Sequence, residues 1–338
     1  MFLSFLLKTE FSLLVKQPGV LSIKNTFESG QIFGWKKFVS SHNSVSQIFY
    51  LGTLNNHALA FRQNQGDHRV YTACWDSFGK KVQIGEKKRK EIQDYFNIDF
   101  SVSREYETKW KNSLNFNKLY EKFEGLRIIN QDIVDCLFSF VCSTNNNIPR
   151  IQRMVNDLKQ YYGEPIFLEG TKLCLKKFPT VYRMAHLDET DQVRLNLGYR
   201  FKYLKAIASF LIKNEEKLTN TKIDQNYNDF TFLNNIKELS YDKAFRELKK
   251  LHGFWQFPSQ VFETTWVVSI TINLELTIFV KVHIYIYCAP AHTLLNVCTR
   301  CQIMTIFRRY HCISIASLHS LDKYLIMASL MMSKAFAP

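Results

Sequence analysis

The sequence has few of the residues that dominate disordered and fibrous proteins. Of its 338 residues only 12 are glycine and 7 are proline, whereas 46% are hydrophobic. This composition excludes a collagen-like or low-complexity chain and leaves enough apolar side chains for a buried core. At this length we expect two or three domains.

Signals for disulfides and for membranes are also scarce. Eight cysteines are too few for a disulfide scaffold in a chain of this length, so we expect a reducing compartment. The apolar start has neither a preceding basic segment nor a small-residue cleavage site, and we interpret it as ordinary chain. The apolar run Thr264–Val280 contains Glu275 and is slightly short for a bilayer span, which favours a strand or misfit sequence over a membrane helix.

Acidic residues are outnumbered. The chain has 44 Lys and Arg against 30 Asp and Glu, for a net charge of +14, which favours an anionic partner such as nucleic acid or an acidic membrane surface. Only 9 of the 85 residues from 254 onward are charged, against 65 of the first 253. We therefore expect the soluble domains to end near Gly253.

Hydrophobic spacing separates a strand-rich first part from a helical second part. Short apolar and aromatic runs between turn residues predict strands that include 31–35, 47–51 and 58–61. Apolar residues at helical spacing predict later helices over 133–141, 151–158, 204–211 and 241–251. The predicted fold is α+β, with an antiparallel sheet domain followed by a helical domain.

Between two of the predicted helices lies an unusual polar stretch, CSTNNNIPR, from Cys142 to Arg150. Three consecutive Asn residues suit a turn, and Pro149 suits the first turn of the next helix. The stretch is either a capped helix–helix turn or a surface that presents Asn amides and the Arg150 guanidinium to base edges or phosphates.

Two further segments combine glycine with aromatic residues. In Leu197–Tyr203 (LGYRFKY), a glycine turn places Tyr199 and Arg200 at a predicted helix start. An aromatic ring beside cations suits unstacked bases and phosphates, or else the tyrosine packs in the core. In Ser29–Trp35 (SGQIFGW), glycine permits close approach of the backbone to a flat ligand, and an ordinary hairpin turn is the alternative.

In this order the segments resemble the eukaryotic-type 8-oxoguanine DNA glycosylases of the helix–hairpin–helix superfamily. The resemblance runs from about residue 20 to Gly253, and its most specific part is the 20-residue block that ends at Arg150. The blocks that carry it are Ser29–Trp35, Glu91–Phe100, Gly125–Asn130, Gln131–Arg150, Phe178–Pro179 and Leu197–Arg200.

The resemblance implies roles for five residues in binding a nucleotide that is swung out of the duplex. The backbone carbonyl of Gly30 would accept the N7 hydrogen that distinguishes 8-oxoguanine from guanine. Asn145, Arg150 and Arg200 would hold the estranged cytosine, and Tyr199 would wedge beside it.

The resemblance also implies an activity and a setting. Family members excise 8-oxoguanine in base-excision repair and cleave the abasic site by β-elimination, without a metal or other cofactor. The implied partner is double-stranded DNA that contains 8-oxoguanine opposite cytosine, and we expect a monomer without membrane association. The substrate implies residence in the nucleus, with a mitochondrial pool as the alternative.

The catalytic part of the family pattern is missing from this sequence. Where the family has a Leu-Pro-Gly-Val-Gly-x-Lys hairpin, this chain has Trp255 in place of a glycine and Phe257 at the position of the nucleophilic lysine. Lys281 and His283 only weakly echo the downstream segment that carries the family's assisting Asp. We therefore leave the catalytic residues unassigned and predict little or no lyase activity.

These observations divide the chain into three predicted parts. Residues 1–120 form the sheet domain, residues 121–253 form a helical glycosylase domain with an incomplete hairpin, and residues 254–338 lie outside the family pattern. Two explanations are open for residues 254–338. Either splicing or a wrong gene model replaced the family's C-terminal part, so that these residues are disordered or misassigned, or the chain is a genuine non-catalytic binder of damaged DNA. Within these residues the Cys298–Cys301 pair is a weak zinc signal, and the apolar runs are an aggregation hazard.

Overall fold

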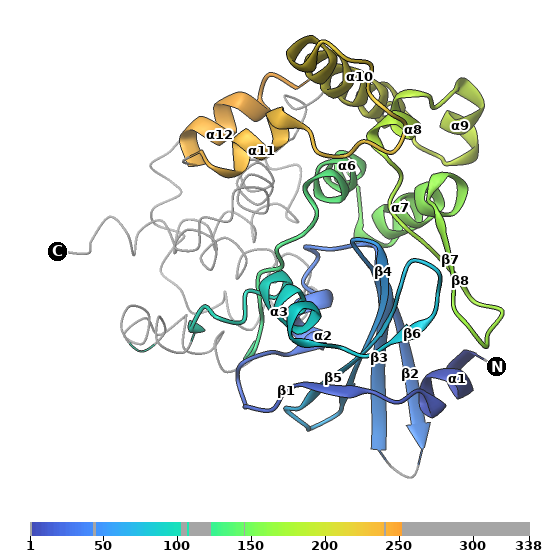
Figure 1. The fold of residues 1–338 in the computed structure, drawn as a ribbon, viewed down its shortest axis with the longest axis vertical. Helices are drawn as coiled ribbons and strands as arrows, with labels where there is room; N and C mark the ends of the chain where they lie inside the picture. The colour runs from blue at the N-terminus through green and yellow to red at the C-terminus, as the bar shows by residue number, and fades with distance from the viewer. Residues whose placement is uncertain are drawn as a thin grey trace, which may run out of the picture.

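The computed structural model describes residue 107 and the ranges 2–42, 45–102, 123–144, 146–239 and 241–251. They form a sheet and a group of helices that lie side by side (Figure 1). The prediction of an antiparallel sheet followed by a helical region is confirmed. The predicted boundaries at 120 and 253 and the whole part from 254 onward, with its apolar run and CxxC pair, lie outside the described residues.

The sheet is antiparallel and has the strand order β1-β5-β4-β3-β2, with the short β6 paired to β5. Strands β2 to β5 follow one another as a meander, which needs only short turns between neighbours. The strands are β1 (Ser12–Val15), β2 (Lys36–His42), β3 (Val45–Leu54), β4 (His57–Asn64), β5 (Val70–Trp75) and β6 (Lys81–Val82).

Both faces of the sheet are covered, because alternate residues of β3 and β4 are apolar on either side. On one face Tyr50 and Phe61 pack against α2 (Ile23–Phe27) and α3 (Glu86–Tyr95). The other face packs against α1 and the hairpin of β7 and β8. Those elements are α1 (Phe2–Lys8), β7 (Pro165–Phe167) and β8 (Cys174–Lys176).

The helical region is built around α6 (Ile133–Ser143), of whose 11 residues 10 are buried. It lies between the sheet and α10, and it runs back through a short turn into α7 (Figure 1). The helices expected from the apolar spacing are thereby confirmed. The remaining helices are α7 (Ile148–Tyr162), α8 (Val181–Ala185), α9 (Glu189–Arg194), α10 (Arg200–Thr219), α11 (Thr231–Lys237) and α12 (Tyr241–Leu248).

The strand predicted over 31–35 is wrong, since these residues form no regular element. The side chain of Gln31 explains the difference. Its amide donates to the carbonyls of Thr26 (3.0 Å) and Arg127 (2.8 Å), and its oxygen accepts the backbone N–H of Ile129 (2.9 Å). These bonds join the segment to the chain that leads into α6, in place of a strand ladder.

We expect Gln31→Ala to lower the free energy of unfolding by about 2 kcal/mol, because it leaves the buried N–H of Ile129 and two buried carbonyls without this partner. The measurement is urea unfolding. Gln160→Ala, at an exposed position of α7, is the control and should change stability little. Equal effects of the two substitutions would contradict the role given to Gln31.

Candidate functional site

Two of the three consecutive asparagines cap helices in the turn between α6 and α7. The side chain of Asn147 accepts the backbone N–H of Arg150 at 3.0 Å and caps the start of α7, while Asn146 donates to the carbonyl of Cys142 at 2.9 Å. Pro149 lies in the first turn of α7, as predicted. Asn145 lies outside the described residues, so its base-contact role stays a prediction.

The carbonyl of Thr144, at the end of α6, accepts hydrogen bonds from side chains at the start of α10. The hydroxyl of Tyr199 donates to it at 3.0 Å, and Arg200 donates through Nε at 3.1 Å and also through Nη2. Arg200 is only 2% exposed, whereas Tyr199 is 41% exposed, with its ring 4.6 Å from the Arg200 guanidinium carbon. The structure therefore brings these two segments together, with the tyrosine outward and Arg200 inward.

Arg150 and Thr144 leave polar atoms of this cluster unsatisfied. Nη2 of Arg150 lies 3.5 Å from two oxygens of Asn196, the outer limit for a hydrogen bond, and its buried Nε has no partner within the described ranges. The buried hydroxyl of Thr144 likewise has no partner in the part of the chain that the structure describes. Because buried polar groups in native proteins are nearly always paired, this cluster is suited to receive polar atoms of a ligand.

Positive charge persists at this cluster. Burial is the main cause that lowers the pKa of Arg200, and the charge of Arg150 lowers it further. A guanidinium nevertheless keeps its proton in proteins, so both side chains are cations at neutral pH. The cluster thus offers fixed donors, two cations and an exposed aromatic ring.

Gly30 lies near the opposite end of α6 from this cluster. Its φ of +79° is in the left-handed region that favours glycine. The next residue, Gln31, accepts the side-chain amide of Gln131 on its carbonyl at 2.7 Å, just before α6 begins. Since α6 has 11 residues, the two places are about 16 Å apart along its axis, so a ligand that contacts both would follow the helix.

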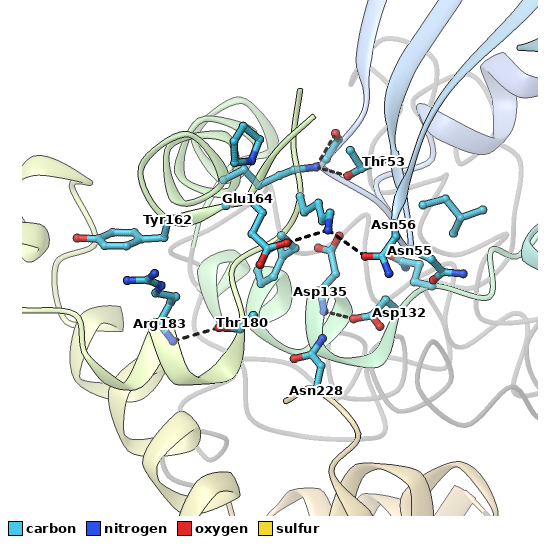
Figure 2. A pocket seen from close by; sticks show the side chains of 18 of the residues that line it. Thr53, Asn55, Asn56, Asp132, Asp135, Tyr162, Glu164, Thr180, Arg183 and Asn228 are labelled. Atoms are coloured by element: carbon cyan, nitrogen blue, oxygen red, sulfur yellow. Dashed lines mark hydrogen bonds and ion pairs between the residues drawn. The ribbon is translucent and has the colours of Figure 1, made fainter. Parts of the chain in front are cut away.

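A second concave feature is a cavity of about 890 Å³ between the sheet and the helical region. Figure 2 shows polar side chains from both parts around it, among them Asn55 and Asn56 after β3 and Asp135 from α6. No local pattern in the sequence indicates this cavity, because its lining comes from short segments far apart in the chain.

Lys159 of α7 and Asp135 of α6 form the most unusual pair in the cavity wall. Lys159 is 6% exposed and donates to the carbonyl of Gly34 and the hydroxyl of Thr53, each at 3.3 Å. Burial raises the pKa of Asp135 to about 6 despite the opposing charge of Lys159. Burial likewise lowers the pKa of Lys159, which the charge of Asp135 opposes.

The raised pKa of Asp135 predicts a pH dependence. The folded protein holds this proton more tightly than the unfolded chain, so the group's contribution to stability is present at about pH 4 and is lost as the pH rises through about 6. We expect Asp135→Asn to gain stability relative to the natural protein between pH 4 and pH 7. The measurement is urea unfolding of both proteins across that range, and a constant difference would contradict the prediction.

Two other kinds of site receive no support from the described ranges. No helix there is long and apolar enough to cross a membrane, and no group of His, Cys, Asp and Glu there could hold a metal ion. The positions discussed for catalysis, Phe257, Lys281 and His283, lie outside the described residues.

Comparison with known proteins agrees with the motifs. Residues 13–137 match the family described as 8-oxoguanine DNA glycosylase, N-terminal domain. The chain is 29% identical over 195 residues to the N-glycosylase/DNA lyase OGG1 of Arabidopsis thaliana, covering 56% of this chain. It is 27% identical over 251 residues to the N-glycosylase/DNA lyase of Saccharomyces cerevisiae, covering 72% of this chain. The aligned parts span 48% and 62% of those proteins, respectively.

Solved structures share the fold. The 8-oxoguanine glycosylase/lyase of Clostridium acetobutylicum in its apo form has a TM-score of 0.60 at 18% identity, covering 97% of this chain and 95% of its own. The same enzyme with double-stranded DNA containing cytosine opposite 8-oxoguanine has a TM-score of 0.57 at 18% identity, covering 97% and 98%. MBOgg1 with a low affinity DNA ligand has a TM-score of 0.59 at 17% identity, covering 97% and 99%.

Proposed function

We propose that this chain, a relative of the 8-oxoguanine DNA glycosylase/lyases, binds double-stranded DNA that contains 8-oxoguanine opposite cytosine and acts in base-excision repair. The observation that carries the proposal is the cluster at the end of α6, where the buried Nε–H of Arg150 has no partner among the described residues and the Arg200 guanidinium lies against the exposed ring of Tyr199. The net charge of +14 and the crystal structure of a relative with such DNA support the same partner.

The cluster offers what an opened base pair requires. Extrusion of a nucleotide costs a few kcal/mol in lost stacking and pairing, and the protein must replace both. An exposed aromatic ring such as that of Tyr199 can stack against the gap, and the guanidinium of Arg150 can donate to the base that has lost its partner. Arg200, held on the Thr144 carbonyl, would fix the ring and contribute its charge.

The chemical step is proposed separately from recognition. The relatives are N-glycosylases and DNA lyases, and the lyase step requires an amine nucleophile. Because Phe257 stands where the motif has lysine, we propose that this chain recognises the lesion with little or no strand cleavage, as a non-catalytic binder of damaged DNA. Monomeric action in the nucleus, with a mitochondrial pool as the alternative, is proposed from the nature of the substrate.

We expect Arg150→Ala to weaken binding to an 8-oxoguanine:cytosine duplex by about tenfold, because one positioned donor set is worth about 1–3 kcal/mol. Fluorescence anisotropy at fixed salt is the measurement. Lys217→Ala is the control, since it removes a positive charge about 26 Å along α10 from Arg200. Equal losses for the two variants would indicate general electrostatics and would sink the assignment of Arg150.

Borohydride trapping tests the chemical proposal. We expect the full chain to give no covalent adduct with an 8-oxoguanine:cytosine duplex, because Phe257 cannot form a Schiff base. Phe257→Lys is the matched variant, and it tests whether a restored amine is sufficient to form the trapped adduct. An abundant adduct with the natural chain would show that another amine does the chemistry.

A further inference from the structure

The segment 29–35 has no strand or helix to hold it, so its position depends on side-chain contacts. Gln31 fixes its first half through the bonds to Thr26, Arg127 and Ile129. Phe33 is buried in the core of the helical region, where its ring meets that of Phe140 with 6.2 Å between centroids. The second half, which enters the sheet, requires a further contact.

Lys159 supplies that contact. Its ammonium donates to the carbonyl of Gly34 and to the hydroxyl of Thr53 on β3, so one side chain of α7 ties the segment to both domains. The fit is close, because a Cβ on Gly34 would lie 3.0 Å from Nζ of Lys159 and 4.0 Å from Oδ2 of Asp135. The absence of a side chain at Gly34 therefore leaves the space that the ammonium occupies.

Asp135 balances the buried charge. A buried ammonium is costly without an opposite charge nearby, and the two atoms that accept from Lys159 are neutral. The carboxylate of Asp135 faces the same side of Gly34, and its other oxygen accepts the hydroxyl of Ser139 at 2.9 Å. Stability alone does not require this arrangement, since an apolar side chain could fill the space without the cost of burying charge.

We infer that Lys159 is a positioning residue that holds the segment 29–35 in the place from which the Gly30 carbonyl, in the role that the family resemblance implies, would discriminate 8-oxoguanine from guanine. The inference rests on the proposed function. Lys159 acts through its bond to the carbonyl of Gly34, four residues after Gly30. It should therefore govern lesion discrimination.

The chain offers a matched control in the same cavity. Lys177 also lines it, but its ammonium contacts Glu164 at 2.8 Å and Asn56 at 3.0 Å, both outside the segment. Lys177→Met removes the same charge as Lys159→Met and leaves the contacts of Gly34 in place.

The experiment compares the full-length natural protein with Lys159→Met, with Asp135→Asn/Lys159→Met and with Lys177→Met. Three quantities are measured: the urea midpoint, hydrogen exchange of peptides that cover 29–35, and the ratio of affinities for 8-oxoguanine:cytosine and guanine:cytosine duplexes. The double variant is essential, because Lys159→Met alone leaves the Asp135 carboxylate without its counter-charge and could fail to fold.

We expect Lys159→Met to lower the midpoint and the double variant to recover most of that loss. In both, exchange of the segment should rise and the affinity ratio should fall by about fivefold, the equivalent of one hydrogen bond, because the bond to Gly34 is still missing. Lys177→Met should change neither the exchange of the segment nor the affinity ratio. A double variant that regains the natural exchange and ratio together with its stability would overturn the inference and leave Lys159 a merely structural residue.

The two hypotheses fail differently. If the natural protein binds damaged and undamaged duplexes equally, the proposed function is wrong, and the exchange of 29–35 alone decides whether Lys159 holds the segment. If the natural protein prefers the lesion and Lys159→Met keeps the full ratio, the function stands and the role of Lys159 is wrong.

Discussion

The burial of α6 among the other helices and Phe33 fixes where both proposed contact regions lie. The helix is apolar almost all round, so it is stable only where neighbours cover every side. Its start is next to the segment of Gly30 through the bond between Gln131 and Gln31. Its end presents the Thr144 carbonyl, which binds Tyr199 and Arg200. The two proposed contact regions therefore lie at opposite ends of α6.

The two ends of α6 differ in how completely their polar groups are hydrogen-bonded. Near the start, the side chain of Gln31 donates to the carbonyl of Thr26 and accepts from the N–H of Ile129, and the adjacent Gly30 has a left-handed φ. At the far end, Arg200 donates to the Thr144 carbonyl, whereas Nε of Arg150 has no partner among the described residues. An unpaired buried donor lowers stability, and a ligand that supplies the acceptor recovers that loss as binding energy. Under the proposed function, the unpaired donor of Arg150 would therefore favour the DNA-bound state.

The sequence predicts regular elements better than it predicts contacts. Apolar periodicity is sufficient to predict α6, α7 and α10, because the residues of one helical face are only three or four positions apart in the sequence. The apolar and aromatic residues of 31–35 predict a strand, whereas the bonds of the Gln31 side chain to Arg127 and Ile129 hold the segment in an irregular conformation. Asn146 and Asn147 cap helices in the structure, whereas the sequence alone does not decide between capping and contact with bases. The contact of Lys159 with Gly34 joins residues 125 positions apart, and no local pattern signals it.

The central claim is that Arg150 pairs with the base left behind when the opposite nucleotide swings out. A double-mutant cycle tests it most directly: Arg150→Ala is combined with replacement of the estranged cytosine by an abasic nucleotide, and all four affinities are measured by anisotropy. We expect a coupling energy above about 1 kcal/mol, because Arg150 loses its acceptor when the base is absent. Strictly additive losses would show that Arg150 senses only the phosphate backbone and would contradict the account.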